Sequence, residues 1–224
     1  MANYEEETAS TKLAAFIEKN KKFFIAAIVI IICAVIGYII AASVMNKATA
    51  KNLQALDEIV FELTDKSSDL EEAEVETRRQ TAIEKASAYV KKGGITGARA
   101  NMLCADLTYQ QKKYSESAEY WKETAKKAKK SYLAPIAYFN LAACNEELGQ
   151  TDEAAANYKL AADSKDFVMR EHAMFSYARV METKGDYTEA SAVYTELNDK
   201  YSDSEWANLA KSRLIALKND GKIQ

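Results

Sequence analysis

The most apolar part of the chain lies near its N-terminus. Residues 23–44, from Phe23 to Val44, contain neither a charged residue nor a proline. A helix rises about 1.5 Å per residue, so this segment would reach about 33 Å, enough to cross a hydrocarbon core of about 30 Å. A core helix of this length in a soluble protein would present a polar face, and this segment has none. The pattern predicts a transmembrane helix over residues 23–44.

A cleaved signal peptide is the alternative interpretation of the same segment. The small residues Ala41, Ala42 and Ser43 end the apolar run, as small residues do before a cleavage site. The apolar region of a signal peptide usually spans about 7–15 residues, and this run is longer. A retained anchor is therefore favoured.

The lysines beside this segment predict its orientation. Lys and Arg close to a span favour the cytoplasmic side, whereas acidic residues such as Glu5 to Glu7 count for little. Lysines are more frequent before the span than just after it: Lys12, Lys19, Lys21 and Lys22 against Lys47 and Lys51. The bias predicts a short cytoplasmic tail over residues 1–22 and places the rest of the chain on the extracytoplasmic side.

The pattern changes to amphipathic helices after the span. Apolar residues three and four positions apart mark one helical face between residues 51 and 66: Leu53, Leu56, Ile59, Val60 and Leu63. Ser68 with Glu71 has the spacing of a capping box, which predicts the start of a second helix. The glycines of KKGGITG, residues 91–97, predict the end of that helix. Residues 45–97 are expected to form a helical spacer or an N-terminal hairpin.

Three similar turns recur in the rest of the chain. KKYSES, GQTDEA and GDYTEA start at Lys112, Gly149 and Gly185, which are 37 and 36 residues apart. An apolar helix precedes each turn and an aromatic residue follows it. The small residues within the first helices are Ala105, Ala142 and Ala178, and the aromatic residues in the second helices are Trp121, Tyr158 and Tyr194. One hairpin cannot bury its apolar face alone, so three hairpins over residues 98–201 are expected to stack as a solenoid.

The end of the chain predicts one more helix. Ser202 with Glu205 has capping-box spacing before the apolar run WANLAKSRLIAL. Residues 202–224 are therefore expected to form a capping helix and a tail.

Composition supports helices and narrows the function. The chain has one proline and seven glycines among 224 residues, so helix breakers are rare. Its net charge of −3 argues against nucleic-acid binding as the main task. The cysteines Cys33, Cys104 and Cys144 match no metal motif. Cys104 and Cys144 lie among apolar residues and are interpreted as small buried side chains, although a disulfide between them stays open.

The sequence carries no catalytic constellation. Its single histidine, His172, lies in the apolar segment FVMREHAMFSYARV, where a structural role is more typical than a catalytic one. No Ser/His/Asp or Cys/His pattern, phosphate-binding loop or zinc-ligand spacing is present. We therefore expect no enzymatic activity, no cofactor and no metal.

Binding of protein segments is better supported. The first helices of stacked hairpins line the concave surface, and the repeat register assigns that surface a set of apolar residues with polar edges. These residues are Arg99, Met102, Leu103, Asp106 and Tyr109, then Ile136, Phe139, Asn140 and Glu147, then His172, Phe175 and Arg179. Such a surface suits an extended or helical peptide. The alternative is that Leu103, Phe139 and Phe175 are covered by the N-terminal helices or by neighbouring hairpins.

The three turns resemble those of tetratricopeptide repeats, whose second helix typically follows the pattern G-x-Y-x-x-A. GDYTEA has all three motif residues, GQTDEA has Thr151 in place of the aromatic, and KKYSES keeps only Tyr114. The resemblance implies an all-α fold, with one N-terminal transmembrane helix followed by a tetratricopeptide-like solenoid of helical hairpins.

The order of the segments resembles the YfgM-type family. An acidic opening and LAAFIEKNKKFF precede one span with Gly37 in its second half, and a helical spacer leads to the repeats. Members are single-span proteins of the bacterial inner membrane with a periplasmic tetratricopeptide-like domain. The resemblance implies a scaffold or chaperone accessory, with subunits of the Sec translocon, a membrane-anchored peptidyl-prolyl isomerase and exported client chains as partners.

Two alternatives to this function stay open. In the first, the chain is a scaffold of another envelope-assembly complex. In the second, the repeats face the cytosol and act as a receptor or co-chaperone. Many such receptors grip a C-terminal carboxylate with Lys, Asn and Arg on the inner helices. The register places Met102, Asp106, His172 and Ser176 at clamp positions, and only Asn140 fits. A clamp is therefore disfavoured, and an enzyme hidden in the helical fold is the least supported hypothesis.

Overall fold

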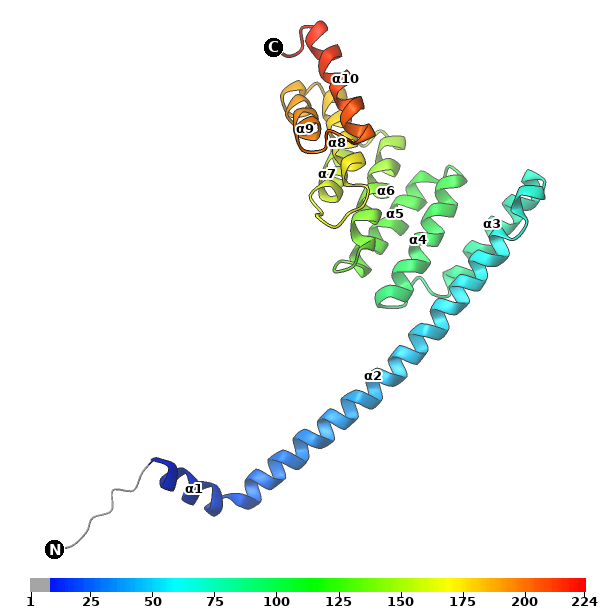
Figure 1. The fold of residues 1–224 in the computed structure, drawn as a ribbon. Helices are drawn as coiled ribbons and strands as arrows, with labels where there is room; N and C mark the ends of the chain where they lie inside the picture. The colour runs from blue at the N-terminus through cyan, green and yellow to red at the C-terminus, as the bar shows by residue number, and fades with distance from the viewer. Residues whose placement is uncertain (1–8) are drawn as a thin grey trace, which may run out of the picture. The chain divides into compact units, whose positions relative to one another are not determined.

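The computed structural model describes residues 9–224, so residues 1–8 of the predicted tail, with Glu5 to Glu7, lie outside the described residues. Every regular element in the described part is a helix, which confirms the all-α prediction (Figure 1). The helices are α1 (Ala9–Lys19), α2 (Lys21–Thr64), α3 (Glu72–Ser87), α4 (Gly94–Gln110), α5 (Tyr114–Lys127), α6 (Leu133–Glu147), α7 (Thr151–Ala162), α8 (Arg170–Thr183), α9 (Tyr187–Lys200) and α10 (Glu205–Asn219), with a short 3-10 helix, η1 (Ser67–Asp69), after α2. The chain divides into two compact units, Met1–Lys51 and Asn52–Gln224.

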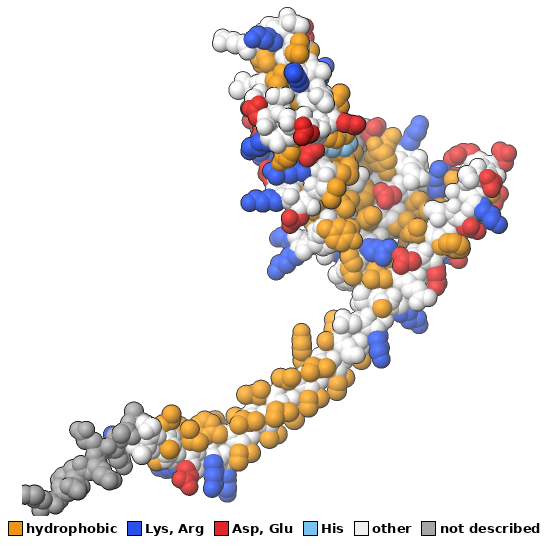
Figure 2. All heavy atoms as spheres, viewed as in Figure 1, with side chains coloured by type: hydrophobic (Ala, Val, Ile, Leu, Met, Phe, Trp, Pro, Cys, Tyr) orange, Lys and Arg blue, Asp and Glu red, His pale blue; other side chains and the backbone are white. Residues whose placement is uncertain are grey.

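The first unit contains α1 and the apolar part of α2. Among the described residues, α2 is the one helix that length and composition allow to cross a membrane, with a mean hydropathy of 3.1 over its most apolar stretch. None of that stretch is buried, and its side chains cover the helix with hydrophobic surface (Figure 2). The core helix of a soluble protein would be mostly buried, so this exposure leaves α2 as a candidate membrane span.

The second unit begins with a hairpin formed by the end of α2 and by α3. Both helices pack on α4 through one apolar cluster, whose buried members are Leu56, Ile59, Ala82, Ala86, Ala100, Cys104 and Leu107. Residues 45–64 continue α2 as a helical spacer, and the chain reverses after Thr64 so that α3 forms a hairpin with the end of α2.

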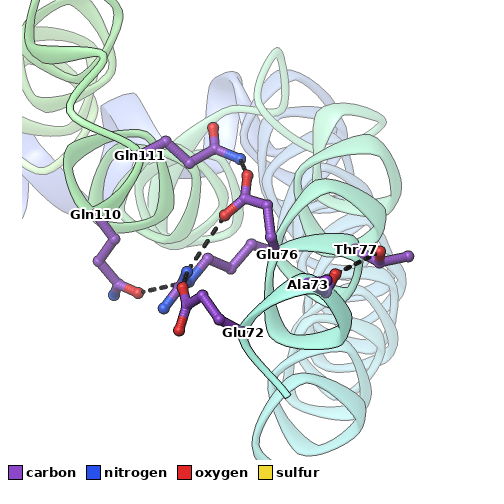
Figure 3. Close-up of polar contacts among 7 residues, drawn as sticks. Glu72, Ala73, Glu76, Thr77, Gln110 and Gln111 are labelled. Atoms are coloured by element: carbon purple, nitrogen blue, oxygen red, sulfur yellow. Dashed lines mark hydrogen bonds and ion pairs between the residues drawn. The ribbon is translucent and has the colours of Figure 1, made fainter. Parts of the chain in front are cut away.

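A polar cluster also joins α3 to α4 (Figure 3). The Arg79 guanidinium donates to Glu72 (2.8 Å) and Glu76 (3.2 Å) on its own helix and to the Gln110 side chain (3.1 Å) on α4. Gln111 in turn donates its side-chain amide to Glu76. The cluster fixes α3 against the end of α4, and no sequence motif indicated it.

The turn after α2 corrects the first capping-box prediction. Helix α3 begins at Glu72, and Ser68 lies in η1, where its hydroxyl donates to Asp69 (3.3 Å) instead of capping a helix. Arg78 from α3 donates to the carbonyls of Glu62 (3.3 Å) and Asp65 (2.6 Å). These bonds satisfy carbonyls that the end of α2 leaves free. Ser68 therefore lies in the turn between α2 and α3, and α3 begins four residues after it.

Three hairpins follow, as the repeat predicts. They pair α4 with α5, α6 with α7 and α8 with α9, and each helix packs on the next. The first helices also contact one another: α4 contacts α6, and Phe139 of α6 contacts His172 of α8. Helix α10 continues this layer by its contact with α8. The first hairpin begins at Gly94, four residues before the predicted start at 98. The last helix is capped by Ser204, which accepts from the Trp206 N–H (3.2 Å), so Ser202 is the wrong cap.

The repeated residues occupy the core in the expected way. The small residues of the first helices, Ala105, Ala142 and Ala178, have no exposed surface. The aromatic residues of the second helices are also buried, with 2% of Trp121, 3% of Tyr158 and none of Tyr194 exposed. Small residues allow neighbouring helices to approach closely, and the aromatic side chains fill the space between hairpins.

The start of α4 contains another close approach. The Asn101 side chain donates to the carbonyls of Val90 (2.8 Å) and Gly97 (2.7 Å), which holds the turn before α4 against that helix. A Cβ on Gly97 would lie 1.8 Å from the Lys92 carbonyl oxygen. Gly97 therefore permits this contact between two stretches of backbone.

The three hairpin turns share one backbone geometry. Lys112, Gly149 and Gly185 all adopt left-handed φ values of 59°, 70° and 81°. In each turn the next N–H bonds back to the carbonyl five residues earlier, at 2.9, 2.8 and 3.0 Å. This is the hydrogen bonding of a Schellman helix end, which favours glycine at the left-handed position.

Lys112→Gly is therefore expected to stabilise the second unit by about 0.5–1 kcal/mol, because a side chain is disfavoured in the left-handed region. Gly185→Ala at the equivalent position should destabilise it by a similar amount. Urea unfolding of the full chain in detergent, followed by circular dichroism, measures both changes. Unchanged midpoints in both variants would contradict this assignment of backbone strain.

Candidate protein-binding face

The twelve predicted binding residues lie on the layer of first helices. Eleven of them are half-buried and Glu147 is exposed. They come from α4, α6 and α8, and we call them, together with Trp206 of α10, the inner face. Figure 2 shows hydrophobic side chains gathered over this layer, with acidic side chains among them. The surface is neither fully buried nor fully solvated, as a docking surface requires.

An aromatic row crosses the inner face. The His172 ring stacks on the Trp206 ring at 3.7 Å with an angle of 8° between their planes. The Phe139 ring lies 4.8 Å from His172, and the Phe175 ring lies 5.5 Å from Trp206. The four half-buried rings come from α6, α8 and α10. We call these four residues the aromatic row.

Sequence reasoning missed Trp206 as part of this face. The sequence did contain a signal for it, because Gly221 follows Gly185 by 36 residues, the spacing of the earlier turns. The structure confirms that Gly221 is left-handed, with a φ of 65°. The helix α10 therefore has the register of a first helix. That register places Trp206 beside the first helix α8.

The surroundings of His172 keep its imidazole ring uncharged. Burial lowers the pKa of His172, and the nearby Arg179 charge lowers it further. An imidazole with a lowered pKa is neutral at pH 7. His172 thus contributes a flat, uncharged ring to the aromatic row.

The apolar residues differ in what covers them. Leu103 packs against the cluster that contains Leu56 and Ile59 from the end of α2, so the N-terminal hairpin covers part of it. Phe139 and Phe175 pack against aromatic side chains of neighbouring helices and remain partly exposed. The alternative that other helices cover this surface therefore applies to Leu103 on α4 more than to the aromatic row.

Both arginines of the inner face are engaged in ion pairs. Arg99 bonds Asp57 at 2.7 Å. Arg179 makes two bonds to Glu146, at 2.7 and 2.6 Å, and the Tyr158 hydroxyl donates to the same carboxylate at 2.6 Å. Burial acts to raise the pKa of Glu146, but the bonds from Arg179 and Tyr158 outweigh it and lower the pKa. The positive charges on this face are therefore neutralised.

The Glu146 arrangement recurs one repeat later. Glu182, 36 residues on, accepts from the Tyr194 hydroxyl (3.2 Å) and from Arg213, whose Nε lies 3.2 Å away. Each set joins the two helices of one hairpin to the next first helix. The sequence signal is a glutamate in the last turn of a first helix, a tyrosine twelve residues later and an arginine in the following first helix.

Two carboxylates of the inner face lack a counter-charge. Neither Asp106 nor Glu147 has an ion-pair partner within residues 9–224. Asp106 is half-buried, and burial raises its pKa to about 6. Burial also raises the pKa of Cys144, and the charges of Asp106 and Glu147 add smaller contributions to that rise.

The single residue that fits a carboxylate clamp is engaged locally. The Asn140 side chain donates to the carbonyl of Ile136 in its own helix at 2.9 Å. Ser176, at another clamp position, is buried. With Arg99 and Arg179 both paired, the twelve predicted residues offer no free cation for a C-terminal carboxylate.

The two core cysteines behave as small buried side chains. Cys104 and Cys144 are free thiols without exposed surface, and the Cys144 thiol donates to the Ser117 hydroxyl at 3.3 Å. Burial, with a smaller effect from Glu116, raises the pKa of Cys104 to about 12. Thiols with raised pKa values are poor nucleophiles at neutral pH.

Replacing Asp106 by asparagine should make the fold less dependent on pH. The folded-state pKa of about 6 exceeds the unfolded value of 3.8, so the folded chain binds the proton more tightly and loses stability as pH rises from 4 to 6. Asp106→Asn should therefore stabilise the chain by about 2 kcal/mol at pH 8 and by little at pH 4. Urea unfolding at both pH values tests this, and an equal effect at the two values would contradict it.

Comparisons with known proteins agree with this fold. Residues 104–167 match the family described as tetratricopeptide repeat. A TPR repeat-containing protein of Treponema pallidum (strain Nichols) is 33% identical over 128 residues, which are 57% of this chain and 54% of the relative. The match thus spans about half the length of that curated relative.

Solved structures show the same architecture at low sequence identity. TPR-like repeats of a putative kinesin light chain from Podosopora anserina superpose with a TM-score of 0.57 at 12% identity, covering 78% of this chain and 89% of that one. The apo form of RapI gives 0.50 at 14% identity, covering 62% of this chain and 40% of that one. At these identities the likeness concerns the fold alone. The second unit is a tetratricopeptide-like solenoid, and its residues 104–167 match the tetratricopeptide repeat family.

Proposed function

We propose that this chain is a membrane-anchored scaffold whose inner face binds segments of other proteins. The aromatic row carries the proposal, because four adjacent rings lie half-buried on the layer of first helices, where a bound segment can contact them. Large aromatic side chains supply much of the binding energy where proteins meet. The ion pairs beside the row keep the first helices in register, so the surface is preformed.

We further propose that residues 23–44 anchor the chain in a bacterial inner membrane, with the tail cytoplasmic and the second unit periplasmic. The uncharged and exposed surface of this helix supports the anchor. The excess of lysines before the span supports the orientation. Anchoring would hold the inner face close to membrane partners and raise its local concentration there.

Cysteine labelling in spheroplasts tests the orientation. Asp166→Cys places a thiol on an exposed loop of the second unit, and Ser10→Cys places one in α1 without removing a lysine. Both variants also carry Cys33→Ser, and the buried Cys104 and Cys144 should react slowly with the reagent. A membrane-impermeant maleimide should label position 166 in intact spheroplasts and position 10 only after lysis. The reverse pattern would establish a cytosolic second unit.

The resemblance to the YfgM-type family supports specific partners. We propose that the chain associates with subunits of the Sec translocon, with a membrane-anchored peptidyl-prolyl isomerase and with exported client chains. Affinity purification of the full chain from mild detergent tests this association. Translocon subunits should co-purify with the full chain. Their consistent absence, with subunits of another envelope complex in their place, would favour the alternative assignment.

A further inference from the structure

The charges on the inner face are unbalanced. Arg99 and Arg179 are paired with Asp57 and Glu146. His172 is neutral at pH 7, because burial and the Arg179 charge lower its pKa. Two charged residues of the twelve therefore have no ion-pair partner among residues 9–224: the carboxylates of Asp106 on α4 and Glu147 at the end of α6.

We propose that the inner face selects a protein segment in which a lysine or arginine lies beside aromatic or aliphatic residues. The apolar residues would cover the aromatic row, and the basic side chain would pair with Asp106 or Glu147 of the same face. This inference rests on the proposed binding function and specifies the chemistry of the bound segment.

The position of Asp106 supports an external partner. A half-buried carboxylate without a hydrogen-bonding counter-charge costs folding stability, and no described residue of the chain compensates it. A basic side chain from a bound segment would supply the missing charge where water is partly excluded. Such pairs are stronger than fully exposed ones.

The tyrosine rings near Glu147 suit a cation as well. The Tyr109 and Tyr114 rings lie 5.1 Å apart, and the Glu147 charge contributes to raised pKa values of both hydroxyls, after the larger effect of burial. A lysine or arginine near Glu147 would therefore also contact ring faces. An acidic segment would meet repulsion at the same place.

Trp206 allows the binding to be measured on the full chain. The protein has two tryptophans, and Trp121 is buried in the core. Trp121→Phe leaves Trp206, in the aromatic row, as the single reporter. Three synthetic peptides share the same phenylalanine and leucine positions and carry lysine, glutamine or glutamate at the others. The full chain is titrated with each peptide in detergent, with Trp206 fluorescence as the readout.

The lysine peptide should bind about tenfold more tightly than the glutamine peptide, and the glutamate peptide most weakly. Asp106→Asn with Glu147→Gln should abolish the preference for the lysine peptide over the glutamine peptide. Asp163→Asn with Glu153→Gln makes the same charge change at exposed sites outside the inner face and should preserve the preference. Higher salt should reduce the preference of the unaltered chain.

The outcomes separate this inference from the proposed function. Equal affinity for the lysine and glutamine peptides, or a preference for glutamate, would overturn the charge selection but leave peptide binding by the face intact. Absence of binding for all three peptides would overturn both. A lysine preference that survives Asp106→Asn with Glu147→Gln would assign the selection to other residues and also overturn the inference.

Discussion

Tyr194→Ala is expected to lower the free energy of unfolding of the second unit by about 4 kcal/mol. The Tyr194 side chain has no exposed surface, and its ring lies 5.6 Å from that of Phe175. It fills the space between α8, α9 and α10, which alanine would leave as a cavity. Its hydroxyl donates to Glu182, so the truncation also removes one bond from the set that contains Arg213.

Tyr194→Phe is the matched control for this prediction. It keeps the ring and removes one hydrogen bond, so a loss of about 1 kcal/mol is expected. Urea unfolding of the full chain in detergent, followed by circular dichroism, measures both variants. In a stacked array the last hairpin should unfold before the others once its contacts weaken. A loss below 1 kcal/mol for the alanine variant would show that α9 is not packed as described.

Gly97→Ala should destabilise the second unit by about 3 kcal/mol, despite the higher helix propensity of alanine. The added Cβ would lie 1.8 Å from the Lys92 carbonyl oxygen and 2.8 Å from its carbonyl carbon. Both atoms are backbone, so no rotamer change relieves the clash, and the turn before α4 must move. That movement would also strain the two bonds that Asn101 donates.

Gly93→Ala, four residues earlier, tests whether this effect is specific. Its Cβ would meet no atom within 4 Å, and the Gly93 φ of −78° suits any residue. We expect a change of less than about 0.5 kcal/mol. Amide hydrogen exchange of residues 88–101 should show faster exchange in Gly97→Ala alone. Equal stability of the two variants would contradict the close approach at Gly97.

Periodic features of the sequence predicted most of the second unit. Apolar residues three and four positions apart indicate amphipathic helices, and turns that recur after 37 and 36 residues indicate stacked hairpins. The buried positions of Ala142 and Tyr158 follow from the same repeat. These features are local or repeated, so one chain contains enough information to find them.

Capping residues were predicted less well. Ser68 and Ser202 both have the spacing of a cap, yet α3 begins at Glu72 and Ser204 caps α10. A capping box has several possible positions in a serine-rich turn. The choice among them depends on contacts from distant residues, such as the bonds of Arg78 to the end of α2.

The inner face was likewise predicted only in part. The repeat register predicted its half-buried side chains, but the register does not show which charges are paired. Arg179 bonds Glu146, 33 residues earlier, whereas Asp106 has no ion-pair partner among residues 9–224. Pairing between hairpins depends on side-chain geometry that a single sequence does not contain, and the chemistry of the face follows from that pairing.

Photo-crosslinking in living cells tests most directly whether the inner face binds proteins. The full chain would carry a benzoylphenylalanine at position 175 of the aromatic row or, as a control, at the exposed position 160 of α7. Position 175 should give discrete protein adducts that weaken when Phe139→Ala is added, and position 160 should give none of them. Equal adducts from both positions, or adducts at 175 that Phe139→Ala leaves unchanged, would contradict the account.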